Sequence, residues 1–78
     1  MKRYKIQMLC TNNGGRFFAE HPVFAEGDDD FKNRAFPEWK EDMDRTCVMF
    51  SDVRLLYTVT RVIRVDQEEQ TTDIVVPQ

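Results

Sequence analysis

The feature that most constrains the fold is a hairpin signal at residues 12–15, which read Asn-Asn-Gly-Gly. Asn and Gly tolerate the positive φ angles that tight hairpin turns require. Apart from Leu9, residues 4–10 alternate apolar and polar side chains, and this period of two is typical of a strand with one buried face. Residues 16–26 are predicted to form the second strand, in which Pro22 indicates an edge position or a bulge because proline cannot donate to a ladder.

The next segment has the pattern of a helix. Three aspartates follow Gly27, and carboxylates suit a helix N-terminus, where they accept from free N–H groups at the positive end of the dipole. Proline costs about 3 kcal/mol inside a helix and little at its first position. Because of Pro37 we predict a short helical turn near residues 28–35 and a main helix over residues 37–48, with a single kinked helix as the alternative. The apolar stripe recurs at every fourth position, at Phe31, Ala35, Trp39, Met43 and Cys47.

The clearest strand is residues 54–65, which are rich in β-branched side chains. Its predicted buried face comprises Leu55, Tyr57, Val59, Ile63 and Val65. Arg61 breaks that face, so either a bulge near Thr60 shifts the strand or Arg61 lies at the rim of the buried side. We interpret residues 47–50 as helix end and loop, and residues 71–77 as a candidate short edge strand.

The order of elements is therefore β-β-α-β, with or without a further C-terminal strand. We predict a single α+β domain over residues 1–78, with one main helix packed on one face of a small antiparallel sheet. A chain of 78 residues buries only about 60% of its unfolded surface, so the core is expected to be thin. The other face of the sheet is left to solvent or to a partner.

The sequence lacks the usual signs of catalysis or of a cofactor. His21 is the only histidine, and Cys10 and Cys47 fit no metal or redox spacing. No nucleotide-binding fingerprint or nucleophile motif is present. No apolar run approaches the roughly 20 residues of a membrane span, and the N-terminus does not have the pattern of a signal peptide. We expect a cytoplasmic protein that is not an enzyme and needs neither metal nor cofactor.

The aspartate triplet admits three interpretations: a metal site, a helix start or a recognition surface. Adjacent carboxylates point in different directions, and the segment fails the EF-hand template of alternate ligands with a central Gly and a closing Glu. A helix start with an acidic surface is therefore favoured over a cation site.

The charge is arranged in blocks, although its sum is only −3. Residues 1–16 carry four basic side chains and no acid, whereas residues 17–44 carry nine acids against three basic side chains. Residues 45–65 reverse the sign again, with four arginines against Asp52. If the basic blocks are strands and the acidic block is a helix, the surface is polarised. Direct nucleic-acid binding is not favoured, since no aromatic side chains are evidently interleaved with the exposed charges.

Two short strings carry a resemblance to a known family. The segments "HPVFAE" and "YTVTRVIRV", set in the order of a basic strand, a hairpin, an acidic helix start and a last strand, resemble the small RNA polymerase inhibitor of T7-like phages. The similarity covers residues 2–65 in order of elements, with letter-by-letter likeness only in "PVFAE" and "TVTRV". It implies one helix over three antiparallel strands and a protein that is not an enzyme but binds the jaw of the bacterial polymerase.

The resemblance also implies a contact residue. An arginine that the family uses against the polymerase falls on Arg61, within "VTRV". The family's next strand arginine has no direct match, because Ile63 stands there and Arg64 lies one place beyond. The connection before the last strand is longer than in the family, and the tail after Val65 is extra.

We therefore predict a small non-catalytic protein-binding module, a phage-type inhibitor of a larger host protein complex, with bacterial RNA polymerase as the first target. One predicted binding patch consists of Arg54, Arg61, Arg64, Arg3 and Lys5. A second consists of Asp28, Asp29 and Asp30 with the helix acids. The alternative is an anti-CRISPR or anti-restriction protein whose acidic helix region mimics nucleic acid. An enzyme is the least favoured class.

Overall fold

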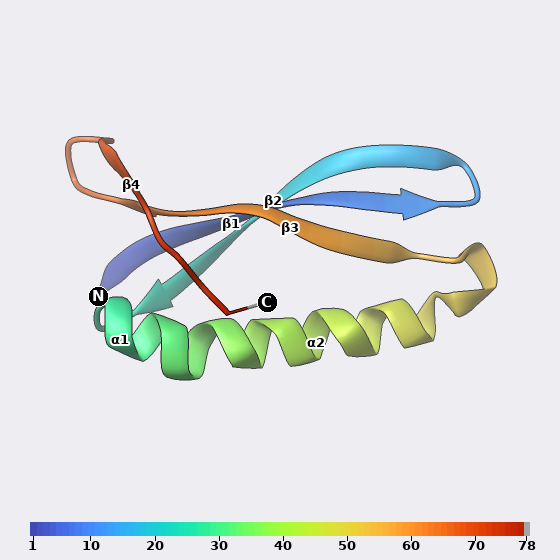
Figure 1. Ribbon diagram of the computed structural model, residues 1–78, viewed down its shortest axis with the longest axis horizontal. Helices are drawn as coiled ribbons and strands as arrows, with labels where there is room; N and C mark the ends of the chain where they lie inside the picture. Colours follow the sequence, from blue (N-terminus) through green and yellow to red (C-terminus); the bar gives the residue numbers. More distant parts are fainter. Residues whose placement is uncertain (78) are drawn as a thin grey trace.

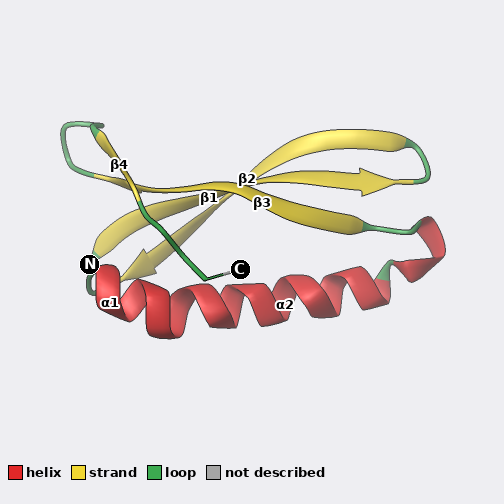
Figure 2. Ribbon diagram, viewed as in Figure 1, coloured by secondary structure: helices red, strands yellow, loops and turns green. Residues whose placement is uncertain are grey.

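The computed structural model describes residues 1–77. A four-stranded antiparallel sheet lies against one long helix, as Figures 1 and 2 show. The strands are β1 (Lys2–Asn12), β2 (Gly15–Ala25), β3 (Leu56–Val65) and β4 (Thr71–Asp73), in the spatial order β2-β1-β3-β4. This α+β architecture confirms the predicted fold class, and β4 is the further C-terminal strand.

The β1–β2 hairpin forms where the sequence predicts it. The ladder runs to the pair Asn12 and Gly15, and Gly15 has a φ of 128°, which L-residues rarely adopt. The backbone N–H of Gly14 donates to Asn12 Oδ1 at 2.8 Å and helps to close the turn. β2 is an edge strand, so Pro22 lies where the missing N–H costs least, as expected.

β3 contains a bulge. Gln7 pairs with Arg61 and Met8 pairs with Val59, so Thr60 is the additional residue between them. The bulge confirms the first of the two predicted explanations for Arg61. It also corrects the predicted buried face beyond residue 60. Partners in an antiparallel pair share a face. Val62 and Arg64 therefore lie on the helix side opposite Ile6 and Tyr4, whereas Ile63 and Val65 lie on the outer face.

One continuous helical segment follows β2 (Figure 2), so the predicted division into a short turn and a separate main helix is wrong. The alternative of a single helix holds, and the irregularity near Pro37 is a π-helical turn. The segment comprises α1 (Asp28–Asp30), a π-helical turn η1 (Phe31–Ala35) and α2 (Phe36–Met49). The N–H of Phe36 donates to the carbonyl of Phe31, five residues back. Pro37 directly follows this wide turn, and the helix continues because the π geometry shifts the hydrogen bonding where proline lacks a donor. A 3-10 turn η2 (Ser51–Val53) leads to β3.

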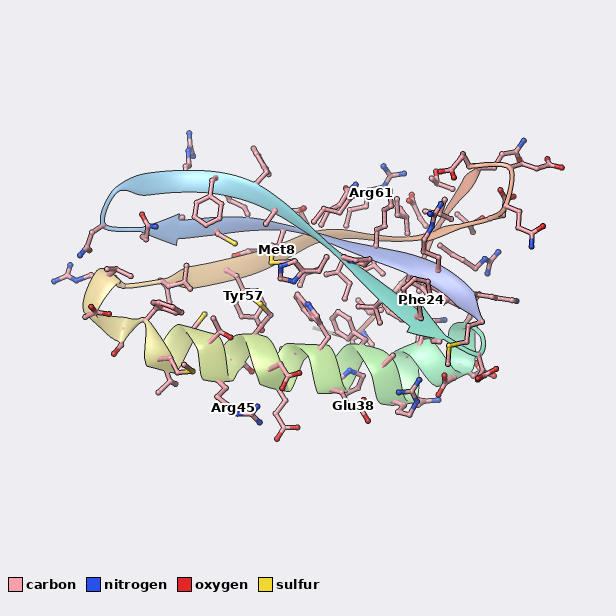
Figure 3. The ribbon with its side chains drawn as sticks, turned by 180° about the vertical axis from the view of Figure 1, so that it is seen from behind. Met8, Phe24, Glu38, Arg45, Tyr57 and Arg61 are labelled. Atoms are coloured by element: carbon pink, nitrogen blue, oxygen red, sulfur yellow. The ribbon has the colours of Figure 1, made fainter. Side chains whose placement is uncertain are left out.

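The core lies between the helix and one face of the sheet. Tyr4 and Phe31 stack with ring centroids 4.3 Å apart, and Phe36 packs beside Phe31. Figure 3 shows Met8 and Tyr57 between the sheet and α2, Arg61 on the opposite side of the sheet, and Glu38 and Arg45 on the solvent side of the helix. Most of the predicted helix stripe faces the core: Phe31 and Ala35 are buried, and Trp39 and Met43 pack against the buried cluster. Cys47, at the end of the stripe, is half-buried.

Candidate partner-binding surface

Asp28 holds the start of the helix to the sheet. Its carboxylate accepts from the hydroxyl of Tyr4 at 2.7 Å and from Nη1 of Arg64 at 2.7 and 2.8 Å. These bonds, the Arg64 bond first, lower the pKa of Asp28, and burial together with Asp28 raises the pKa of Tyr4 to about 12. Asp28 therefore joins three segments that are distant in sequence, and it is engaged within the protein.

The other two aspartates of the triplet differ from Asp28 and from each other. Asp30 accepts from Arg34 at 2.7 and 2.9 Å and from the backbone N–H of Glu26 at 2.8 Å, and these bonds lower its pKa to about 2. Asp29 is exposed and has no ion pair among residues 1–77. The triplet does mark a helix start, as predicted, but its three members do not form one free acidic surface.

Three of the predicted basic side chains share the outer face of the sheet. Arg3, Lys5 and Arg61 lie there together, but each is matched by an acid. Arg3 pairs with Glu69 at 2.9 Å, Lys5 with Glu20 at 3.5 Å and Arg61 with Asp73 at 2.8 Å. The acids come from β2, β4 and the turn before β4, so the predicted separation of basic strands from an acidic helix does not hold on this face. The signs are interspersed on this face.

The remaining two arginines of the predicted patch lie elsewhere. Arg64 is on the helix side of the sheet, bound to Asp28, because the bulge at Thr60 reverses the facing of every residue after it. Arg54 precedes β3 at the other end of the molecule, is exposed and has a left-handed backbone with φ 56°. The five basic residues therefore occupy three separate places rather than one patch.

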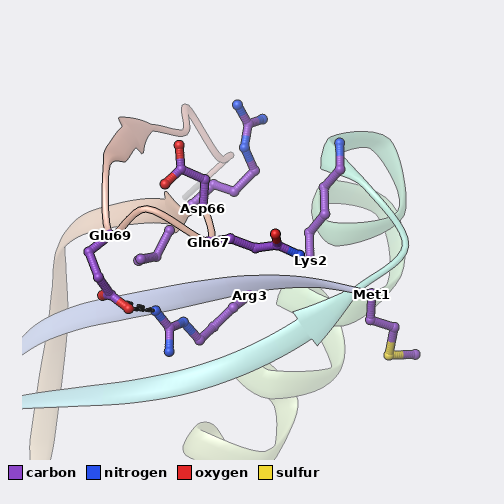
Figure 4. A pocket seen from close by; sticks show the side chains of 8 residues that line it. Met1, Lys2, Arg3, Asp66, Gln67 and Glu69 are labelled. Carbon is purple, nitrogen blue, oxygen red and sulfur yellow. Dashed lines mark hydrogen bonds and ion pairs between the residues drawn. The ribbon is translucent and has the colours of Figure 1, made fainter.

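A hollow of about 610 Å³ lies beside the N-terminus, shown in Figure 4. Arg3 and Glu69, which form a bidentate ion pair, are part of its lining, and Asp66 and Lys2 also line it. Both cations and carboxylates line this hollow, so it presents no single sign of charge to a ligand.

The side chains of the histidine and the two cysteines are engaged or shielded within the fold. His21 accepts a hydrogen bond at Nδ1 from the indole N–H of Trp39 at 3.0 Å. Burial raises the pKa of the thiols of Cys10 and Cys47, which disfavours the thiolate that a nucleophilic cysteine needs. Within residues 1–77 there is no group of three side chains that could hold a metal ion.

Large exposed apolar side chains gather at one end of the molecule. Here the hairpin turn, the end of α2, η2 and the start of β3 meet, and the N–H of Asn13 donates to the carbonyl of Val53 at 2.9 Å. We call this the open end and define it by its exposed apolar residues: Phe17, Phe18, Val48, Met49, Phe50, Val53 and Leu56. Phe18 is 80% exposed and Met49 71% exposed.

The opposite end, where the helix starts, is closed. Tyr4, Phe31 and Phe36 are at most 2% exposed there, and the bonds of Asp28 tie the helix start to β1 and β3. We call these four residues with Arg64 the closed end. The sequence prediction missed the open end, although Leu9 gave a signal. It departs from the apolar alternation and lies on the outer face opposite Phe18.

Comparisons with known proteins return no counterpart: no family model, no curated protein and no solved structure matches the chain. No helix in the described part of the chain is both long enough and apolar enough to span a membrane.

Proposed function

We propose that this protein is a non-catalytic protein-binding module. The observation that carries the proposal is the open end, where seven large apolar side chains remain exposed. Large apolar side chains that stay exposed at one end of a small domain are typical of an interaction site. Aromatic residues and methionine, which are present here as Phe17, Phe18, Phe50 and Met49, are the types enriched at protein interfaces.

The environment of the reactive side chains supports a binding role over a catalytic one. The imidazole of His21 is already engaged by Trp39, and the raised thiol pKa values of Cys10 and Cys47 disfavour nucleophilic attack. A pair of titratable groups whose environments push their pKa values apart, poised at a cleft, is the usual sign of acid–base catalysis. The strongest shifts here belong to groups engaged in structural hydrogen bonds, such as Tyr4 and Asp30.

As the first target we propose bacterial RNA polymerase, inhibited in the bacterial cytoplasm by a phage-type protein. The support is the resemblance of the β-β-α-β order and of "TVTRV" to the phage inhibitor family. Arg61, the residue that the resemblance implicates, is half exposed on the outer face, and its partner Asp73 is itself exposed. A target carboxylate could replace Asp73 at little cost, since exposed ion pairs contribute about 0 to 1 kcal/mol.

The direct test is binding and transcription with purified bacterial RNA polymerase. Phe18→Glu and Met49→Glu should each weaken binding by about 1 to 3 kcal/mol, because they place a charge in an apolar interface. Val75→Glu is the matched control, since Val75 is 84% exposed but belongs to the tail after β4. Full inhibition by both open-end variants would remove the open end from the proposal. Absence of any polymerase binding by the wild-type protein would remove this target.

A second pair of variants tests the strand arginine. Arg61→Glu should weaken polymerase binding by about 1 to 3 kcal/mol if Arg61 meets the target, with little loss of folding stability. Arg45→Glu on the solvent side of α2 is the control, because Arg45 is also exposed and paired with an acid, Asp42. Equal affinities of the two variants would contradict a role for Arg61.

The alternative, an anti-CRISPR or anti-restriction protein that mimics nucleic acid, has weaker support. Asp28 and Asp30 bind Arg64 and Arg34, which leaves Asp29 as the exposed member of the triplet without an ion pair among residues 1–77. Asp29→Asn distinguishes the two functions: it should abolish activity for a nucleic-acid mimic and leave polymerase binding unchanged.

A further inference from the structure

Half of one sheet edge is uncovered. β3 pairs with β1 along its whole length, but on its other side β4 pairs only with the three residues Ile63, Arg64 and Val65. One further backbone bond, from the N–H of Ile74 to the carbonyl of Val62 at 2.9 Å, extends this contact by one residue. Residues 56–61 therefore have no strand beside them in the part of the chain that the structure describes. Unpaired strand edges are sites at which another chain can add a strand.

The direction of the free backbone groups follows from the ladder. The carbonyl of Val62 accepts a hydrogen bond from the segment after β4, so the backbone groups of Val62 point away from β1. Val62 and its β1 partner Ile6 therefore form a pair without backbone hydrogen bonds between them. Antiparallel ladders alternate, so Met8 and Cys10 are also non-bonded toward β3. Their partners Val59 and Tyr57 therefore point their N–H and C=O groups away from β1, toward the open side. These two residues offer four backbone groups to an added strand.

A groove runs along this edge, with α2 as its other wall. Its volume is about 400 Å³, and it is lined by residues 56–59 together with Phe36, Lys40, Asp44 and Cys47. An apolar hollow of about 480 Å³ adjoins it and shares Cys47 and Leu56. The site thus combines a hydrogen-bonding edge with an adjacent space for side chains.

The chain's own tail shows what kind of segment this cleft accepts. After β4 the tail runs from the sheet edge toward α2 (Figure 1). Ile74 is 9% exposed and Val76 packs against the core, whereas Val75 between them is 84% exposed. An extended segment with apolar side chains at alternate positions therefore fills one half of the cleft, and the free half presents the same edge and the same helix.

The charges at the free half favour a carboxylate at one end of the occupant. Lys40 lines the groove and Arg54 lines the adjoining hollow, and neither has an ion pair among residues 1–77. Asp44, the acid in the groove lining, already accepts a hydrogen bond from the hydroxyl of Tyr57, and no acid among the described residues lines the hollow around Arg54. A strand antiparallel to β3, as β4 is, would enter beside residue 61 and finish beside residue 56. Its C-terminal end would then lie near Arg54.

A second copy of the chain fits this edge less well than a peptide does. If two β3 strands paired antiparallel about Thr58, residues 63–65 of one copy would lie opposite residues 51–53 of the other. The first range carries β4 on that same edge and the second is η2, so these two elements would overlap.

We propose that the free edge of β3, at residues 56–60, binds an extended segment of a partner protein as an added antiparallel strand. The segment carries apolar side chains at alternate positions, directed into the groove against α2, and a carboxylate at its C-terminal end beside Arg54. This inference rests on the proposed protein-binding function and specifies how the partner is held.

The test is a titration of the isotopically labelled full chain with a hexapeptide of the sequence of residues 71–76, Thr-Thr-Asp-Ile-Val-Val, carrying a free C-terminal carboxylate. Amide signals of residues 56–60 should shift, and hydrogen exchange at the amides of Tyr57 and Val59 should slow. Val59→Pro should weaken binding about tenfold, because it removes an edge donor while the ladder to β1 stays intact. Arg54→Gly should weaken binding about threefold and abolish the preference for the free over the amidated peptide. Glycine suits the left-handed backbone of Arg54.

Three results would overturn the proposal. The first is no shift at millimolar peptide. The second is shifts confined to residues 62–65, which would mean displacement of the tail. The third is protection of Tyr57 and Val59 by self-association without peptide. The titration needs no target protein, so its failure leaves the proposed function standing. Conversely, if the peptide binds at this edge but the protein does not bind RNA polymerase, only the proposed target is wrong. If the Val59→Pro variant does not fold, the test is the affinity of the wild type and of Arg54→Gly for the free and the amidated peptide. The proposal requires that only the wild type prefers the free carboxylate.

Discussion

The closed end and the open end share the same strands and the same helix, yet they bury their side chains to different degrees. At the closed end Tyr4 and Phe31 are fully buried and stacked, and Asp28 adds a short ion pair and a tyrosine bond. At the open end Phe17 is 46% exposed, although it pairs with the buried Cys10. The helix therefore covers the sheet well where it starts and poorly where it ends.

The difference separates stability from recognition. Burial of apolar area is the main favourable term in folding, at about 25 cal/mol per Å². The closed end should then supply most of the free energy of unfolding and exchange its amide hydrogens last. Binding surfaces come from the less stable parts of a protein, since they must leave groups unsatisfied for a partner. The open end and the free edge of β3 meet this condition.

The largest expected effect is the loss of a closed-end aromatic. Phe31→Ala should lower the free energy of unfolding by about 3 to 5 kcal/mol, because it leaves a cavity beside Tyr4 and Phe36. Phe17→Ala at the open end should cost less than about 1.5 kcal/mol, since almost half of that side chain is already in water. Urea unfolding monitored by circular dichroism measures both. Equal losses would contradict the contrast between the two ends.

The elements were predictable because each depends on local pattern. Each element has its own local signal in the sequence. The turn at residues 12–15 has its Asn and Gly residues, the helix has the apolar stripe from Phe31 to Cys47, and β3 has a run of β-branched residues. Even the bulge near Thr60 was visible, as a phase error at Arg61. The faces on which Ile63, Arg64 and Val65 lie depend on where the additional residue enters the ladder, which alternation alone does not show. The sequence pattern therefore places these three side chains on the wrong faces.

The candidate surface was less predictable, for a different reason. The partners of Arg3, Arg61 and Arg64 lie 66, 12 and 36 residues away in sequence. Blocks of charge along a chain do not reveal such pairings, which depend on strand order and register. The exposure of the open end likewise depends on where α2 ends relative to the hairpin. This relative position cannot be predicted from the periodicity of the sequence.

The second contrast concerns the two tyrosine–carboxylate bonds, one at each end. Tyr4 donates to Asp28 at the closed end, and Tyr57 donates to Asp44 toward the open end at 2.6 Å. Asp28→Asn should lower the free energy of unfolding by about 1 to 2 kcal/mol, because Arg64 also loses its partner, with the value limited by partial exposure. Asp44→Asn should cost about 0.5 kcal/mol. Thermal unfolding of the two variants gives the comparison, and a larger loss for Asp44→Asn would reverse the assignment of the ends.

The same bonds predict the response to pH. The pKa of Asp28 is lowered in the folded state, so its contribution is present above about pH 4, where the unfolded carboxyl is ionised, and is lost as the pH falls through the folded value. The pKa of Tyr4 is raised to about 12, so its contribution is full below about pH 10 and is lost as the pH rises toward 12. Tyr4→Phe should reduce the alkaline loss and Asp28→Asn the acid loss, as measured by the urea midpoint across pH. Part of each loss should remain, because the pKa of Tyr57 is also raised and the pKa of Asp30 is also lowered. If the acid and alkaline losses of stability are the same in these variants as in the wild type, other groups cause the pH dependence.

The smallest expected effect on folding belongs to Phe18, an open-end residue that we expect to contribute to binding. Phe18 is 80% exposed on the outer face, so Phe18→Ser should change the free energy of unfolding by less than about 0.5 kcal/mol. The same change removes an aromatic anchor from the open end and should weaken partner binding by about 1 to 2 kcal/mol. Urea unfolding and a binding assay on one preparation measure both quantities. A variant that lost stability and affinity in proportion would mean that the open end serves folding, because a recognition surface can be altered without cost to the core that presents it.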